Sequence, residues 1–189
     1  MASSGCRFVS ARPEADFVTV IVTKPPSNII RCKNVHLQYL CEHAREDEKH
    51  QYMVLTNSET YDPDRAAYLF MGKQGPKFTA LDDENLPAAA GGYEMIFDGV
   101  WASWMVGTKE GWDKHWRSIT KGCRWIMDGL FDGGARRLQT MALANRKQAI
   151  QWYIDGLKMN PCGVWKAYGK KGEDVAFFER LHPNLREIM

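Results

Sequence analysis

Residues 145–157 decide the fold, and they read Asn-Arg-Lys-Gln-Ala-Ile-Gln-Trp-Tyr-Ile-Asp-Gly-Leu. The segment before them, residues 138–144, is apolar and predicts a strand that ends on Asn145. The residues that follow predict a short amphipathic helix over residues 146–158, with Gly156 as its stop signal. This passage from strand to helix fixes how the second half of the chain is arranged.

A pair of strands closes the chain. Residues 164–168 and 174–179 are predicted strands, and the glycines and lysines of residues 169–172 form the turn between them. The order strand, helix, hairpin therefore ends a unit that spans residues 86–179.

The best-patterned helix of the sequence begins after Gly107. Its apolar residues recur at intervals of three and four, which places them on one face; they are Trp112, Trp116, Ile119, Cys123, Ile126 and Leu130. Thr108 is the expected N-cap, and Gly133 and Gly134 are expected to end the helix.

Three strands precede this helix, at residues 77–82, 86–97 and 100–106. A break is expected at Gly91 and Gly92, and Asp98-Gly99 is a dipeptide typical of a tight hairpin turn. The sequence thus predicts an antiparallel meander.

The chain begins with an irregular arm, residues 1–15, followed by a strand at residues 17–23 that is rich in β-branched residues. A helix is predicted within residues 27–45, with Asn34 as a possible cap. The charged run at residues 45–49 is interpreted as a solvated end, and residues 52–55 as a short strand or an extended link.

A second helix is predicted at residues 65–71, because Asp62-Pro63 is typical of an N-cap followed by proline. Gly72 is its expected stop. Residues 46–74 are interpreted as an insert in a single domain of residues 16–189, and we expect that most of this insert can be deleted without loss of folding.

Length and composition limit the classes of protein. The chain has 189 residues, 44% of them hydrophobic, 25% charged, with a formal net charge of +2. One domain with a full core is expected, and the small, scattered charge does not indicate a specific nucleic-acid partner. Five unpatterned cysteines indicate a reducing compartment, and no apolar run is long enough to predict a membrane span.

The summed order is β, α, α, β, β, β, α, β, α, β, β. This order predicts an α/β (α+β) fold, with a mixed, mostly antiparallel central sheet and helices on both faces.

The order and several residues resemble the GNAT (acyl-CoA N-acyltransferase) superfamily. The residues are Asn145, Gly156 and Leu157, together with Leu-Pro-Ala-Ala-Ala-Gly-Gly at 86–92 and Val-Trp-Ala-Ser-Trp-Met-Val-Gly-Thr at 100–108. Within the superfamily, the layout is most similar to the GNAT-like internal virion (core) proteins of short-tailed bacteriophages. The resemblance covers residues 17–181, apart from the insert.

The resemblance implies a place for acyl-CoA, at the turn from the strand ending at Val106 into the helix at Trp112. A helix N-terminus offers free N–H groups and partial positive charge to a pyrophosphate. If acyl-CoA binds, the expected contacts are Met105, Val106, Gly107, Gly111, Trp112 and Asn145. The turn departs from the superfamily pattern, since Glu110 and Asp113 are acidic and Trp112 is bulky.

The catalytic residues that the resemblance implies are also incomplete. Active relatives often carry a Glu on the fourth strand, where this chain has no acidic residue, and a Tyr on the last helix that acts as an acid. Tyr153 is one residue past that place, which Trp152 holds, and one residue turns a helical side chain by about 100°. Tyr153 is the candidate acid if the chain is active, and a core tyrosine otherwise.

Cys32, His36, Cys41 and His43 have side chains that can bind a metal, and the alternative is that they are ordinary helix residues. Their spacing matches no usual zinc motif, so no metal is expected. Cys123 lies on the apolar helix face and is interpreted as a core residue rather than a nucleophile.

Two functions follow as hypotheses. The first is a non-catalytic structural protein of a bacteriophage virion, without cofactor, acting in assembly or genome ejection. Its partners would be other virion proteins and, as a further option, copies of itself; it would reside in the host cytoplasm before assembly. The alternative is an active N-acetyltransferase that uses acetyl-CoA on an amine or a protein.

Overall fold

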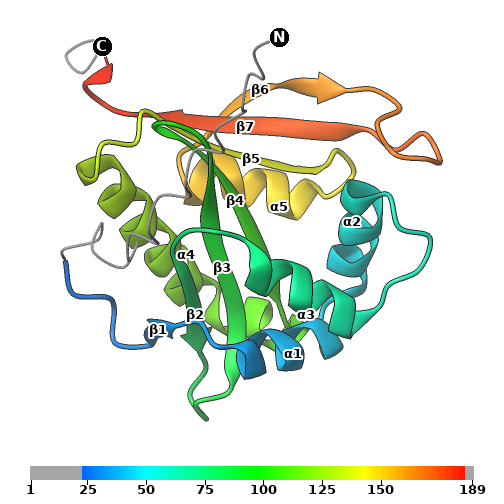
Figure 1. Ribbon diagram of the computed structural model, residues 1–189, viewed down its shortest axis with the longest axis horizontal. Helices are drawn as coiled ribbons and strands as arrows, with labels where there is room; N and C mark the ends of the chain where they lie inside the picture. The colour runs from blue at the N-terminus through cyan, green and yellow to red at the C-terminus, as the bar shows by residue number, and fades with distance from the viewer. Residues whose placement is uncertain (1–22, 186–189) are drawn as a thin grey trace, which may run out of the picture.

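A computed structural model describes residues 23–185 as one seven-stranded sheet flanked by helices (Figure 1). The elements in chain order are β1 (Ile29–Arg31), α1 (Asn34–Glu42), α2 (Glu46–Thr56), α3 (Pro63–Gly72), β2 (Lys77–Leu81), β3 (Pro87–Phe97), β4 (Val100–Gly107), α4 (Lys109–Asp132), β5 (Arg137–Leu143), α5 (Lys147–Gln151), the π-helical turn η2 (Trp152–Gly156), β6 (Asn160–Trp165) and β7 (Val175–Leu181).

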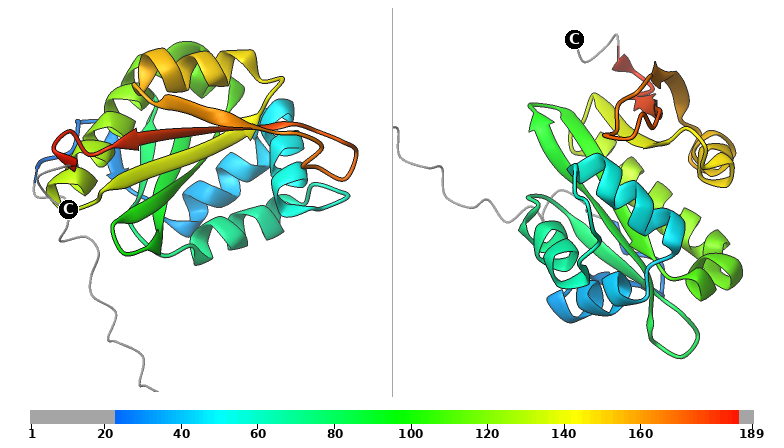
Figure 2. Two further views of the ribbon diagram at one scale, coloured as in Figure 1. Left: turned by 90° about the horizontal axis from the view of Figure 1, so that it is seen from above. Right: turned by 90° about the vertical axis from the view of Figure 1, so that its right-hand side faces the viewer.

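The sheet has the order β1-β2-β3-β4-β5-β7-β6. β4 and β5 are parallel, and the other neighbours pair antiparallel. Helices α1–α3 and helix α4 lie on opposite faces of the sheet, as the right-hand view of Figure 2 shows. The predicted class, a mixed and mostly antiparallel sheet with helices on both faces, is confirmed. Within the described residues, no helix is both long and apolar enough to cross a membrane.

The start of the described chain differs from the prediction. The predicted arm at residues 1–15, and the predicted strand at 17–23 except for its last residue, lie outside the described residues. The single helix predicted within 27–45 is instead the short strand β1 followed by α1, because Ile29 and Ile30 pair with β2. Asn34 is not the cap: Lys33 holds that position, and Asn34 is the first helical residue.

Residues 45–56 are also corrected. The charged run is the start of helix α2 rather than a solvated end, and residues 52–55 are helical. Three acidic residues in the first turn favour a helix here, because they face its partial positive end. The chain therefore has three helices between β1 and β2, one more than predicted.

Helix α3 begins as predicted, since Asp62 Oδ1 accepts a hydrogen bond of 3.0 Å from Arg65 N and Pro63 follows it. Its buried residues, Ala66 and Ala67, share one apolar cluster with Tyr52 of α2 and Leu40 of α1. Residues 46–74 therefore contribute to a buried cluster, which argues against the expectation that most of them can be deleted; the deletion itself stays a prediction.

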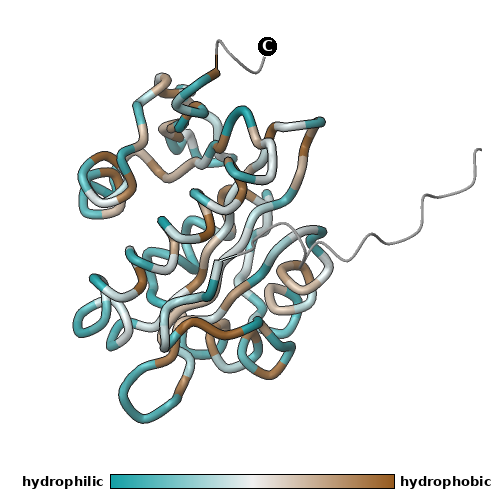
Figure 3. Tube along the Cα trace, turned by 90° about the vertical axis from the view of Figure 1, so that its left-hand side faces the viewer, coloured by the Kyte–Doolittle hydropathy of each residue, from teal (hydrophilic) through white to brown (hydrophobic). Residues whose placement is uncertain are grey.

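The meander β2–β3–β4 is confirmed, with Asp98-Gly99 as the hairpin turn. β3 runs without the predicted break. Gly92 is needed for close packing, because a Cβ there would lie 2.4 Å from Pro76 O. The hydrophilic turn between β2 and β3 is the teal loop at the bottom of Figure 3; there Asp82 Oδ1 accepts hydrogen bonds from Glu84 N and Leu86 N.

Helix α4 follows its predicted pattern, with Ile119, Ile126 and Leu130 buried and Trp116 more exposed than expected. The predicted helix at 146–158 is a short α5 continued by η2. Gly156 permits this turn, since a Cβ there would lie 2.7 Å from Trp152 Cδ1.

We expect Thr108→Ala to lower the free energy of unfolding by about 1 kcal/mol. Thr108 Oγ1 accepts a 2.9 Å hydrogen bond from Gly111 N in the first turn of α4, and alanine removes this acceptor. Urea denaturation measures the effect. Thr108→Ser keeps the hydroxyl and should recover most of the loss; equal losses in both variants would contradict the capping role.

Candidate functional site

Strands β4 and β5 separate and leave a gap in the sheet. They pair only from Val100↔Arg137 to Ala102↔Gln139, although β4 continues to Gly107 and β5 to Leu143. On its other side each strand stays paired along its length, β4 with β3 and β5 with β7. The wide end of the gap therefore leaves backbone groups of both strands without a strand partner.

Two N–H groups point into the wide end of this gap. Thr108 N donates to Ala88 O on the β3 side, so Gly107 N–H faces the opposite side. Ala144 N likewise donates to Asp174 O, so Leu143 N–H faces β4. Buried backbone N–H groups require acceptors.

Helix α2 supplies both acceptors. Glu48 Oε2 accepts from Gly107 N at 2.7 Å, and Gln51 Oε1 accepts from Leu143 N at 3.1 Å. The two side chains are three residues apart and so share one helix face. Side chains of α2 thus take the place of the missing strand-to-strand hydrogen bonds at the wide end of the gap.

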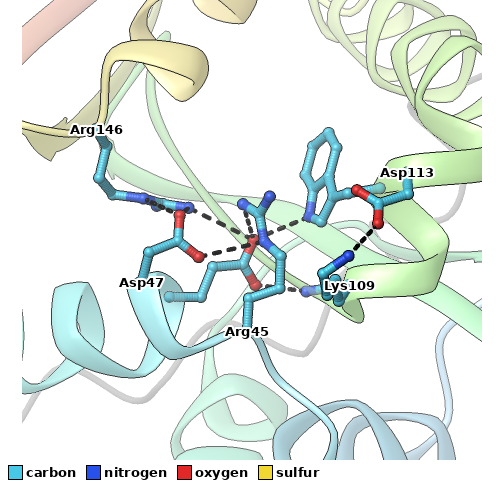
Figure 4. A network of polar contacts seen from close by, with 8 residues as sticks. Arg45, Asp47, Lys109, Asp113 and Arg146 are labelled. Carbon is cyan, nitrogen blue, oxygen red and sulfur yellow. Dashed lines mark hydrogen bonds and ion pairs between the residues drawn. The ribbon is translucent and has the colours of Figure 1, made fainter.

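Glu48 is the centre of a charged network, to which Arg45, Asp47 and Arg146, labelled in Figure 4, also belong. Its Oε1 accepts from Trp112 Nε1 at 2.9 Å and from Arg45 at 3.0 Å, and it lies 3.7 Å from an Arg146 nitrogen. Arg146 also pairs with Asp47 at 2.8 Å. The side chains of Glu48 and Arg146 are only 9% and 8% exposed, whereas those of Arg45 and Asp47 are 21% and 49% exposed, so one cation and one anion of the four charged groups are buried.

Opposing effects act on the pKa of Glu48. Burial raises it and is the largest cause, while Arg45, the Gly107 N–H group and Arg146 oppose the rise. A buried carboxylate is stable when charged partners and hydrogen bonds replace its hydration. Loss of either arginine would therefore leave Glu48 poorly compensated.

The residues predicted to contact acyl-CoA are only partly brought together. Met105, Val106 and Trp112 line a cavity of about 1940 Å³, which reaches both faces of the sheet. Gly107 N–H is already bound to Glu48. Gly111 is packed against β3, where a Cβ would lie 2.3 Å from Ala88 O, and Asn145 is exposed in the β5–α5 turn.

The candidate acid, Tyr153, lines the same cavity. Burial raises the pKa of its hydroxyl, which hydrogen-bonds the Thr140 side chain. Trp152, in the position that the resemblance gives to a tyrosine, turns toward α4: its Nε1 donates to Thr120 Oγ1 at 2.8 Å, and its ring meets Trp112 edge-on.

The cysteines and histidines weighed for a metal have other contacts. His36 Nδ1 lies 3.1 Å from Thr79 Oγ1, which ties α1 to β2. Within residues 23–185, no group of three or more His, Cys, Asp or Glu side chains could hold a metal. Cys123 packs against the apolar core, as predicted.

Two thiols, buried Cys41 and partly buried Cys123, should react slowly with alkylating agents. Burial raises the pKa of Cys41 to about 11 and that of Cys123 to about 12, and the thiolate is the reactive form. At pH 8 we expect exposed Cys162 to be labelled well before both, as mass spectrometry of peptides can measure. In denaturant the three cysteines should be labelled at similar rates. Similar rates in the folded chain would contradict the burial of Cys41 and Cys123.

Solved structures with this fold are acetyltransferases. A GNAT superfamily phosphinothricin acetyltransferase from Sinorhizobium meliloti, in complex with AcCoA, matches with a TM-score of 0.62 and 16% identity over 82% of this chain and 87% of that chain. A putative acetyltransferase from Salmonella typhimurium, yncA, with its cofactor acetyl-CoA, matches with a TM-score of 0.61 and 12% identity. The match covers 82% of this chain and 94% of that chain.

The ribosomal-protein-S18-alanine N-acetyltransferase from Escherichia coli matches at a TM-score of 0.60 and 13% identity, over 82% of this chain and 92% of that one. No protein-family model and no curated protein matches the chain. At these identities the likeness shows the fold, which is that of the GNAT acetyltransferases. The closer resemblance to phage virion proteins stays a prediction.

The cofactor implied by this fold does not fit the gap in this arrangement. The carboxyl group of Glu48 accepts a hydrogen bond from the Gly107 N–H group, at the start of the turn where the pyrophosphate was expected. That N–H group is therefore already hydrogen-bonded and is not free to bind a pyrophosphate. We therefore assign no step of a reaction to acetyl-CoA.

Sequence reasoning missed the central residues of this site. Glu48 and Arg45 lie in the charged run that was interpreted as solvated, and Arg146 was counted only as a helix residue. A possible signal was the acidic run Glu46-Asp47-Glu48, which favours a helix start and so places Glu48 and Gln51 on one face.

Proposed function

We propose that the chain is a non-catalytic protein with the acetyltransferase fold. The observation that carries this proposal is the occupation of the gap between β4 and β5 by Glu48 and Gln51. These side chains accept hydrogen bonds from Gly107 N and Leu143 N, which face the wide end of the gap, and they stand in the wall of the cavity beside it. β4 also lacks an acidic residue to serve as a base.

The biological setting proposed for this protein is a bacteriophage particle, in line with the resemblance noted in the sequence. Its partners would be other virion proteins, with self-association as a further option, and it would pass through the host cytoplasm before assembly. Mass spectrometry of purified particles tests this: the chain should be present in stoichiometric amounts, and its absence would overturn the proposed setting.

An acyl-CoA-dependent N-acyltransferase is the second candidate. It is favoured by the cavity that reaches both faces of the sheet, with Tyr153 in its wall, and by the acetyltransferases that share the fold. It requires α2 to withdraw Glu48 from the gap. Acetyl-CoA hydrolysis and transfer to a panel of amines should be absent under our proposal, and turnover lost in Tyr153→Phe would establish this candidate.

A further inference from the structure

The end of β3 has no neighbouring strand on its β2 side within the described part of the chain. β2 pairs with β3 only as far as Lys77↔Gly92. The next residue, Tyr93, donates its N–H to Pro76 O, and β3 then continues to Phe97 with β4 as its strand partner. The end of the β3–β4 hairpin therefore projects beyond β2 (Figure 1).

Backbone groups on this side of β3 are placed to pair with a further strand. Tyr93 N–H points away from β4, since it donates to Pro76 O. Residues two apart in a strand point their backbone groups to the same side. The N–H and C=O groups of Met95 therefore face the side that β2 leaves open, and an open edge of this kind readily pairs with another strand.

The side chains at this open edge are apolar and exposed to solvent. Met95, Ile96 and Phe97 are 44%, 43% and 71% exposed. The nearest charge on this edge, Glu94, already forms a 2.8 Å ion pair with Lys73. The edge therefore fits an uncharged, apolar strand.

The direction of the chain at the start of the described residues suits this edge. Trp125 Nε1 donates to Thr23 Oγ1 at 2.8 Å, and Asn28 Nδ2 donates to Ser118 Oγ, earlier in α4. Residues 23–28 thus run along α4 in the direction opposite to the helix. α4 runs parallel to β3, because it returns the chain from the end of β4 to the start of β5, which is parallel to β4. The chain that leads into Thr23 is therefore antiparallel to β3.

The position of Thr23 also suits the edge. The ring of its partner Trp125 meets Phe78 of β2 edge-on at 4.8 Å and packs against the cluster that contains Tyr93. Thr23 thus lies near the end of β2, where the open part of β3 begins. The chain before Thr23 leads from there toward Phe97.

Residues 17–22, directly before Thr23, read Phe-Val-Thr-Val-Ile-Val. Every one of them is β-branched or aromatic, and none is charged, which is the composition that favours strands. Six extended residues span about 20 Å, and the open edge from Tyr93 to Phe97 spans about 13 Å. The segment is therefore long enough to follow the whole edge.

We propose that residues 17–22 join the sheet as a strand antiparallel to β3, along its open edge from Tyr93 to Phe97, and cover the apolar side chains there. This strand would close the edge with the chain's own sequence. The inference does not depend on the function proposed above.

Hydrogen–deuterium exchange of the full chain, followed at single amides by NMR, is the measurement. The Met95 amide should exchange at least about tenfold faster in Thr19→Pro/Val20→Pro than in the native chain, the effect of one lost hydrogen bond. Neighbouring residues of a strand point their N–H groups to opposite sides, so one of the two prolines removes a donor to β3 in any register. Thr19→Val/Val20→Thr exchanges the two side chains, keeps both N–H groups and should behave like the native chain.

The Thr108 amide, bound to Ala88 O at the other end of β3 and β4, reports whether each variant stays folded. Fast exchange at Met95 in the native chain would overturn the inference, as would slow exchange that survives both prolines. Protection that depends on protein concentration would assign the edge to a second copy of the chain and would also overturn it. Nuclear Overhauser contacts between Met95 and residues 17–22 are expected in the native chain, and their absence would overturn the inference even if the prolines unfolded the variant.

Discussion

Glu48→Ala is expected to lower the free energy of unfolding by about 3–5 kcal/mol, the usual effect of removing one partner from a buried ion pair. Arg146, at 8% side-chain exposure, would keep only Asp47, and Gly107 N–H would lose its acceptor. Much of the loss is the cost of leaving buried donors unpaired. Urea or guanidinium denaturation, followed by circular dichroism, measures it.

Glu46→Ala is the matched control for this variant. Glu46 is in the same helical turn, but its side chain is 88% exposed and pairs only with Lys49. Exposed pairs of this kind contribute little, so a change below about 1 kcal/mol is expected. If the two variants were equally stable, Glu48 would not lie in the gap and the assignment of the site would fail.

Ala67→Glu should prevent stable folding, or cost more than about 3 kcal/mol. Ala67 is 2% exposed in the cluster formed by α1, α2, α3 and β4, and a carboxylate buried there would lose its hydration. Tyr68→Glu is the matched control, because its side chain is 77% exposed. It should leave stability nearly unchanged, within about 0.5 kcal/mol.

This pair of variants tests the role of residues 46–74. If Ala67→Glu were tolerated as well as Tyr68→Glu, α3 would not belong to the core, and the interpretation of this segment as a peripheral insert would be restored. Thermal melts and solubility of both variants decide the question.

Elements with strong periodic patterns could be predicted from the sequence. The recurrence of Ile119, Ile126 and Leu130, with Thr108 and Gly133 at the ends, defined α4 closely. Asp98-Gly99 placed the β3–β4 hairpin. The class of fold followed from the order of such elements, since local pattern and global arrangement agree there.

The errors have physical causes. α2 has no clear apolar stripe, because its inward residues include Glu48 and Gln51 as well as Tyr52, so hydrophobic periodicity does not reveal it. β1 has only three residues and depends on pairing with β2. Gly92 was interpreted as a break in the strand, but a glycine is needed there because Pro76 O approaches the backbone closely.

The site was partly predictable, because some of its residues lie in segments with a strong local pattern. The turn at Gly107 and Trp112 could be located, because it joins two well-patterned elements. The partner of this turn could not, since Glu48 reaches it across 59 residues of sequence. A charged residue gives no local signal that tertiary packing will bury it.

Calorimetric titration of the native chain with acetyl-CoA tests the central claim most directly, with an acetyl-CoA-binding acetyltransferase of the same fold as a positive control. The internal carboxylate of Glu48 predicts no saturable binding at concentrations that saturate the control. Saturable binding to the native chain with a micromolar Kd would contradict the claim that the gap is closed and the protein non-catalytic.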